Sequence, residues 1–129
     1  MLLNLSDLSS EPLYSQILRQ IRALILNGDL PKDESIPSIR DLARTHKVSA
    51  ITVQKAYEEL AREGLVVSRR GKGYFVADLA FDDRDRMARV NCKESLIKPI
   101  AAALTDGLTE TVIQEIVAEI FREQQTAKH

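Results

Sequence analysis

The 129-residue chain has one cysteine, two histidines and no tryptophan, and these scarcities exclude several classes of protein. A single cysteine, Cys92, cannot build an internal disulfide framework, which favours a reducing compartment. His46 falls in an expected turn and His129 is the last residue, so no Cys/His nucleophile pair or metal-ligand spacing is visible. The sequence also lacks an apolar run of about 18 residues and a basic, apolar leader. We therefore expect a cytoplasmic protein with no membrane partner, no metal and no cofactor.

The net charge is only −1, but it is unevenly divided along the chain. Residues 12–77 hold 11 Lys and Arg against 7 Asp and Glu, whereas residues 78–129 hold 7 against 10. Such asymmetry is a hint of a nucleic-acid-binding face. Ordinary scatter of surface charge would produce an excess this small equally well, so charge alone does not decide between the two.

Apolar residues recur at helical spacing over residues 11–27 and predict a first helix with one buried stripe. The Ser-Ser-Glu-Pro sequence at 9–12 offers hydroxyl caps for its start, and Asn27-Gly28 offers a left-handed stop at its end. Residues 28–38 contain two prolines and several polar turn formers, so this segment is predicted to be a loop.

Two shorter helices are predicted at about 38–47 and 49–63, and they begin at the caps Ser38 and Ser49. Two β-prone runs joined by Arg-Arg-Gly-Lys follow within residues 65–76 and indicate a hairpin with a basic tip. Helices that meet at a tight turn before a hairpin make a winged helix-turn-helix. The predicted fold is therefore mainly α with a small β-hairpin.

The second half of the chain is acidic and Ala-rich, and its apolar pattern predicts helices at about 80–107 and 109–125, the second capped by Thr109. The last helix has a large apolar stripe, which either folds back on its own domain or pairs with a second copy. We favour the homodimer because exposed patches of this size usually mark an interface. The interface between these helices could also hold an unidentified small-molecule effector. The expected dimerisation residues are Ile97, Ile100, Leu104, Ile113, Ile116, Val117, Ile120 and Phe121.

The helix at 49–63 is the element expected to contact DNA, since one helix fits the major groove of about 12 Å. Its apolar side is expected to face the core and consists of Val53, Ala56, Tyr57 and Leu60. This leaves a free N-terminal face that can meet base edges and phosphates. The basic tip that follows contains no acid, so its cations are not neutralised within Arg69–Gly73, and its glycines permit close approach to a sugar-phosphate wall.

Four ordered motifs between Pro12 and Val76 resemble the DNA-binding domain of the GntR family. They read PLYSQILRQIRALILNGDL, IPSIRDLARTHKVS, TVQKAYEELAREGL and RRGKGYFV, and they cover about half of the chain. The short remainder resembles the two-helix dimerisation tail of the YtrA subfamily, whose members are typically repressors near transporter genes. The resemblance implies a winged helix-turn-helix domain over 11–78 and a helical dimerisation tail over 79–126. Its implied function is a transcription regulator, a repressor, that binds a near-palindromic operator as a homodimer.

The resemblance also assigns roles by position. Arg40 matches a DNA-contacting arginine, Ser49 and Thr52 match phosphate-binding hydroxyls, and Gln54 matches a base-contacting position. Ala50 departs from the pattern, because many relatives have an arginine or another polar residue there, and a methyl group can contact only a thymine methyl. Base reading is therefore expected to shift to Gln54, Lys55 and Arg40. The expected DNA-binding set is Ser38, Arg40, Ser49, Ala50, Thr52, Gln54, Lys55, Arg69, Arg70, Gly71 and Lys72.

The sequence fits two other classes of function less well, an enzyme and a winged helix that binds protein or RNA. An enzyme is disfavoured because the acids at 82, 83 and 85 lack the glycine turn and terminal Glu of a calcium loop, and GKGYF leads into no helix as a phosphate loop would. A winged helix that binds protein or RNA is not excluded by fold. The joint presence of Arg40, a Ser/Thr-capped helix and a basic tip favours DNA.

Overall fold

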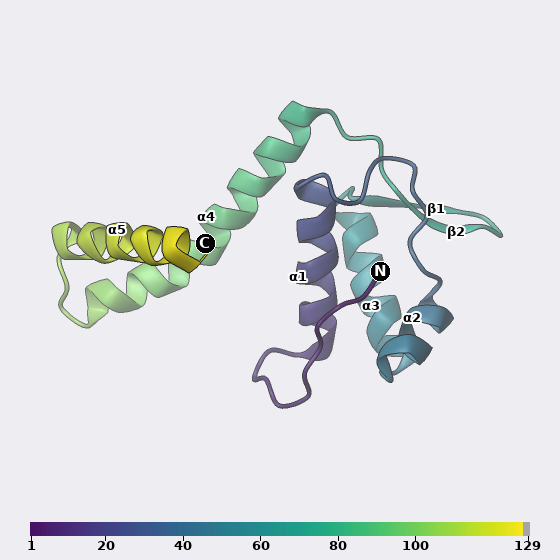
Figure 1. Cartoon of the computed structure of the whole chain (residues 1–129), viewed down its shortest axis with the longest axis horizontal. Helices are drawn as coiled ribbons and strands as arrows, with labels where there is room; N and C mark the ends of the chain where they lie inside the picture. Colours follow the sequence, from purple (N-terminus) through teal and green to yellow (C-terminus); the bar gives the residue numbers. More distant parts are fainter. Residues whose placement is uncertain (128–129) are drawn as a thin grey trace. The chain divides into compact units, whose positions relative to one another are not determined.

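A computed structural model of the chain describes residues 1–127. It confirms the predicted fold class, five helices and a two-stranded antiparallel hairpin (Figure 1). The elements are α1 Leu13–Leu26, α2 Ile39–His46, α3 Ala50–Arg62, β1 Val66–Arg69, β2 Gly73–Val76, α4 Phe81–Thr105 and α5 Glu110–Ala127. The chain forms two compact units, the first Met1–Met87 and the second from Ala88 onward.

The first unit has one apolar core, built where α1, α2, α3 and the hairpin meet. The stripe predicted on α1 supplies Ile17, Ile21 and Ile25, all of which are fully buried. The other buried members are Ile36, Leu42, Ala43, Val53, Ala56, Tyr57, Leu60, Leu65, Val66 and Val76. Because every element of this unit contributes to one core, the elements that could contact DNA rest on a single scaffold.

The predicted hydroxyl cap of α1 is wrong. The helix has Pro12 at its N-cap without a side-chain hydrogen bond, while Ser9 Oγ accepts from the N–H of Glu11 at 3.1 Å in the preceding turn. Proline is favoured near a helix start because it has no N–H to satisfy. A preceding segment instead makes polar contacts with side chains of α1.

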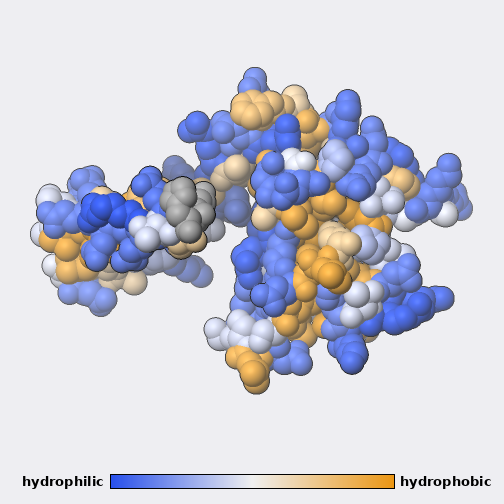
Figure 2. Space-filling model, in the orientation of Figure 1, coloured by the Kyte–Doolittle hydropathy of each residue, from blue (hydrophilic) through white to orange (hydrophobic). Residues whose placement is uncertain are grey.

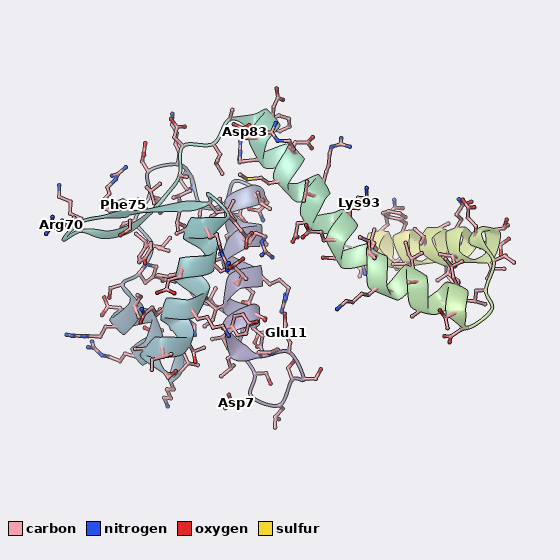
Figure 3. The ribbon with its side chains drawn as sticks, turned by 180° about the vertical axis from the view of Figure 1, so that it is seen from behind. Asp7, Glu11, Arg70, Phe75, Asp83 and Lys93 are labelled. Atoms are coloured by element: carbon pink, nitrogen blue, oxygen red, sulfur yellow. The ribbon has the colours of Figure 1, made fainter. Side chains whose placement is uncertain are left out.

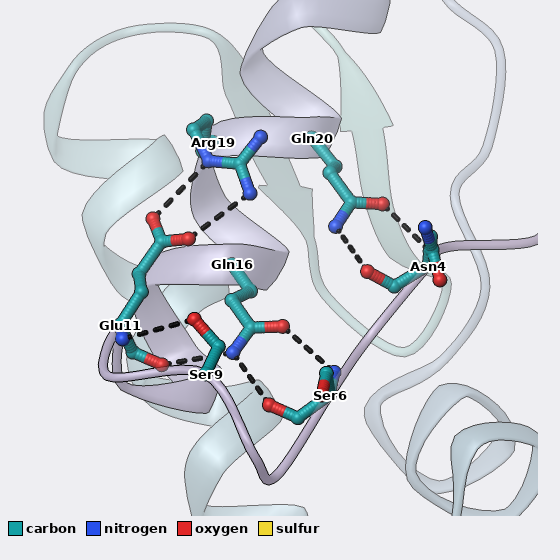
Figure 4. A network of polar contacts seen from close by, with 7 residues as sticks. All are labelled: Asn4, Ser6, Ser9, Glu11, Gln16, Arg19 and Gln20. Atoms are coloured by element: carbon teal, nitrogen blue, oxygen red, sulfur yellow. Dashed lines mark hydrogen bonds and ion pairs between the residues drawn. The ribbon is translucent and has the colours of Figure 1, made fainter.

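That segment is the N-terminal strap, residues 3–11, which lies along α1 (Figure 4). Gln20 pairs in both directions with the backbone of Asn4, at 2.7 and 2.8 Å, and Gln16 pairs likewise with Ser6, at 2.9 Å each way. Gln16 is a buried polar residue, only 3% exposed. At the end of the strap, a hydrogen bond and ion pair from Arg19 lower the pKa of the Glu11 carboxyl.

The segment predicted as a plain loop, 28–38, partly pairs with the hairpin. Ser35 forms an antiparallel bridge with Phe75, Ile36 N–H donates to Tyr74 O at 3.0 Å, and Val76 N–H donates to Glu34 O at 2.8 Å. The turn and proline signals are local, whereas this pairing is made with residues about forty positions away. The wing therefore has backbone support on both edges of β2.

In the second unit, α4 continues through Pro99 and ends at Thr105, and the left-handed Gly107 lies in the turn that follows. Helix α5 then begins at the predicted cap, with Thr109 Oγ1 accepting from Val112 N–H at 3.2 Å. Within residues 1–127, neither α4 nor α5 contains a single buried residue. Several large apolar side chains of this unit are exposed on its surface (orange in Figure 2). Because these two helices bury no residue of their own, packing their apolar side chains against another surface would be favourable.

Candidate nucleic-acid interface

Both helices of the helix-turn-helix begin at the predicted serine caps. Ser38 Oγ accepts from Asp41 N–H at 3.0 Å, and Ser49 Oγ accepts from Thr52 N–H at 3.1 Å. Ser49 and Thr52 also share a hydroxyl hydrogen bond at 2.7 Å. The turn between the helices is closed by Lys47 in the left-handed conformation, at φ +56°. These contacts fix the N-terminal end of α3, where unpaired backbone N–H groups favour a phosphate.

The exposed N-terminal face of α3, which is expected to contact base edges, begins with two apolar residues. Ala50 and Ile51 are exposed, and Ile51 retains 78% of its surface. A side chain this exposed contributes almost nothing to the core. An apolar contact to a thymine methyl is the readout that such residues can make in a major groove.

Two of the residues expected to read bases, Gln54 and Lys55, are engaged within the chain. Gln54 Nε2 donates to Glu58 Oε1 at 2.9 Å, and the ammonium of Lys55 lies 3.8 Å from the centre of the Tyr14 ring. Bidentate recognition of adenine needs both atoms of the Gln54 amide, so Gln54 would have to release Glu58. The i,i+4 spacing made the Gln54–Glu58 pair visible in the sequence, whereas nothing local signalled Tyr14.

The tip of the wing carries two uncompensated cations. Arg70 stands at the end of the hairpin and projects away from the helices (Figure 3). Lys72 N–H closes the turn on Arg69 O at 2.8 Å, and Gly71 supplies the required positive φ of +74°. Among the residues that the structure describes, no acid pairs with Arg70, Lys72 or the exposed Arg40 near the start of α2.

Arg69 differs from its neighbours at the tip. Its guanidinium forms an ion pair with Asp33 at 3.2 Å and lies 4.3 Å from the centre of the Phe75 ring. The acid comes from the segment that pairs with β2, 36 residues earlier in the chain, so the absence of acids within the tip itself could not reveal it. Asp33 holds an unusual positive φ of +67°, which places it beside the wing.

Tyr57 connects the three elements of this surface. Its hydroxyl donates to Pro37 O at 2.7 Å, directly before the cap of α2, and its ring packs edge-to-face on Tyr74 of β2 at 5.2 Å. Because Tyr57 itself belongs to α3, one side chain ties the recognition helix to both neighbours. Burial raises the pKa of this phenol well above its ordinary value.

Replacing Tyr57 with phenylalanine should lower the free energy of unfolding by about 1–2 kcal/mol at neutral pH, because Pro37 O loses its buried donor. The unfolded phenol ionises near pH 10 while the folded one retains its proton, so wild-type stability falls as pH rises above about 10. Urea titrations across this range should show the Tyr57→Phe variant losing less stability, with Tyr14→Phe as the control. Parallel curves for Tyr57→Phe and wild type would contradict this assignment.

The expected dimerisation residues fall on the second unit. Seven are exposed, among them Ile97 at 56% and Phe121 at 64%, and Ile113 is half-buried. A shallow apolar groove of about 680 Å³ runs along α4. Its apolar lining is Leu96, Ile97, Ile100, Ala101 and Leu104. Leu96 was not predicted, although it directly precedes the predicted Ile97.

Residues 1–127 contain no group of three or more His, Cys, Asp and Glu side chains that could hold a metal ion. None of the described helices is both long enough and apolar enough to cross a membrane.

Comparisons with known proteins point to one family. Residues 13–76 match the family described as bacterial regulatory proteins, gntR family. The transcriptional repressor YtrA of Bacillus subtilis is 32% identical over 93% of this chain and 92% of its own length. YtrA from Sulfolobus acidocaldarius, a GntR-family transcription factor of known structure, is 34% identical with a TM-score of 0.59, over 76% of this chain and 100% of that one. The DNA-binding domain of AraR, solved with operator ORX1, is 35% identical with a TM-score of 0.52, over 58% of this chain and 93% of that one.

Proposed function

Because the chain belongs to the GntR family of bacterial regulatory proteins and is a DNA-binding transcription regulator, we propose that it represses transcription by binding a near-palindromic operator as a homodimer. In each half-site, α3 enters the major groove and the tip of the wing reaches the adjacent minor groove. The observation that carries this proposal is the pair of uncompensated cations, Arg70 and Lys72, on a wing that shares one scaffold with the capped start of α3.

Affinity and base recognition come from different residues in this proposal. Arg40, Arg70 and Lys72 bind phosphates, and Gly71 lets the wing backbone approach the groove. The hydroxyls and free N–H groups at the start of α3, with the Ser38 cap of α2, hold further phosphates. Arg69 can bind a phosphate only if its ion pair with Asp33 breaks, so its main role in this proposal is to support the wing.

Base recognition is assigned to Ala50, Gln54 and Lys55, with Ile51 added on account of its exposure. The apolar pair favours a thymine in each half-site. Gln54 contributes fully only after releasing Glu58, and Lys55 only after leaving the Tyr14 ring. Because these internal contacts must be broken first, each half-site discriminates only modestly between base pairs. A dimer reads two half-sites and so doubles the number of base contacts.

The homodimer is supported by the exposed apolar faces of α4 and α5, which together lack an interior. Two copies that share a two-fold axis bury the same residues on each side. The two-fold axis would also present two recognition helices to half-sites about one helical turn, roughly 34 Å, apart.

The full chain should select a duplex with two inverted half-sites from a random pool, and footprinting should protect both. The expected spacing is about 10 base pairs between half-site centres, or a multiple of it. Substituting Ile51→Ser should relax selection at one base pair in each half-site at a cost of about 1 kcal/mol per half-site. Selection of RNA in preference to duplex DNA, or of a single half-site, would refute the proposal.

A further inference from the structure

The first unit also contains a pocket that none of the proposed DNA-binding residues lines. The pocket has a volume of about 310 Å³ and lies where the end of α1, the following loop, the end of β2 and the first turns of α4 meet. Its floor is apolar, with Ile25, Leu30, Val76 and Leu79. Two cations, Lys32 and Arg84, stand on its wall. The volume exceeds the roughly 150 Å³ cavity that accommodates a benzene ring.

Arg84 is the unusual member of this wall. Its Nε is shielded from solvent and has no hydrogen-bond partner, and no acid pairs with its guanidinium within residues 1–127. Two acids near it in sequence pair with other cations, Asp78 with Lys32 at 3.8 Å and Asp83 with Arg86. A half-buried cation without an acceptor is costly, and native structures normally satisfy such a group with a partner, water or ion.

A glycine leaves room for the guanidinium. A Cβ built on Gly28, which ends α1 at φ +88°, would lie 3.1 Å from Arg84 Nη1. The carbonyl end of α1 carries a partial negative charge, which compensates part of the cation. Arg84 Nε nevertheless has no hydrogen-bond acceptor, so this donor remains available to a ligand.

We propose that this pocket binds a small anion, with its carboxylate or phosphate head on Arg84 and Lys32 and any short apolar body on Ile25, Leu30 and Leu79. Arginine donates to either head group with two parallel hydrogen bonds, which a point charge cannot do. The apolar floor favours a small organic acid over a bare inorganic ion. All the residues involved lie within Met1–Met87, so one unit holds the whole site.

Two probes distinguish the forms of the head group, inorganic phosphate and butyrate, each compared with chloride at equal ionic strength. Calorimetry on the full chain should show saturable binding of one or both. At about ten times its dissociation constant, the bound probe should raise the midpoint of thermal unfolding by about 5 °C. Tighter binding of butyrate indicates an organic acid as the ligand class, and tighter binding of phosphate indicates a phosphate ester.

The decisive variant is Arg84→Gln, which should weaken probe binding at least about tenfold and abolish the thermal shift. Arg86→Gln is the matched control on the same helix and should retain both effects. If Arg84→Gln unfolds, Arg84→Lys, which retains the charge without the fork, should still bind at least about tenfold more weakly.

The DNA surface could also attract phosphate, so a third variant separates the two sites. Arg70→Gln/Lys72→Gln should lose operator affinity while keeping the probe-induced shift, and Arg84→Gln should lose the shift while keeping operator affinity. Absence of saturable binding, a shift that survives Arg84→Gln, or a shift abolished by the wing variant would overturn the anion site. None of these outcomes depends on whether the operator is palindromic.

Discussion

Replacing Ile120 with aspartate should convert the protein to a monomer at micromolar concentration and lower its operator affinity about a hundredfold or more. Ile120 is 48% exposed on α5, so the new charge costs little in one copy. In the proposed interface, the same charge would be removed from water without a partner, which is strongly unfavourable. The affinity falls because two linked DNA-binding domains bind far more tightly than either alone.

Sedimentation equilibrium measures the assembly, and a gel-shift titration on the selected operator measures the affinity. Arg122→Glu is the matched control, because it lies two positions from Ile120 and therefore on the opposite side of the helix. Circular dichroism should show the first unit still folded in Ile120→Asp, since that unit has its own core. A wild-type chain that sediments as a monomer, or an Ile120→Asp variant that remains a dimer, would show that the tail has another role.

Reversing the charge of Arg70 and Lys72 together should nearly abolish operator binding while leaving the fold intact. Both side chains are exposed at the tip of the wing and have no acidic partner in the described part of the chain. If each contacts one phosphate, a dimer loses four contacts. The slope of log affinity against log salt should therefore become shallower by about 3.6.

The matched control is Arg86→Glu/Lys98→Glu, which changes the net charge equally on α4 instead of on the wing. Its operator affinity should change only slightly, because neither residue belongs to the proposed DNA-binding set. A wing variant whose salt slope equals that of wild type would mean that the tip makes no phosphate contact. The DNA affinity would then have to come from the two helices of the helix-turn-helix.

The order of elements was predictable because the signals that define it are local. Ser38, Ser49 and Thr109 cap the helices that they were expected to cap, since a side-chain oxygen three residues before an N–H needs no distant partner. The hairpin followed from two β-prone runs around a glycine turn. Ser9 failed as a cap because the N-terminal strap, anchored on Gln16 and Gln20, determines how the chain enters α1.

The chemical state of the candidate DNA-binding residues could not be predicted in the same way. The basic tip was recognised as three equivalent cations, but Asp33 and Phe75 engage Arg69 and leave Arg70 and Lys72 unpaired. Tyr57 was expected as a core residue, and its hydrogen bond to Pro37 O became apparent only when α3 was packed against the segment before α2. Such contacts depend on which distant segments the core brings together.

The winged helix-turn-helix with its basic wing, the family and the two-helix tail were determined by the sequence alone, because capping, periodicity and ordered motifs are written in neighbouring residues. Tertiary structure decided which cations at the wing stay unpaired, which base-reading side chains already have partners, and that Arg84 lines a pocket without an acceptor. The physical reason is that a side chain's hydrogen bonds and ion pairs are set by whatever residue lies next to it in space. For Arg69 that residue is 36 positions away.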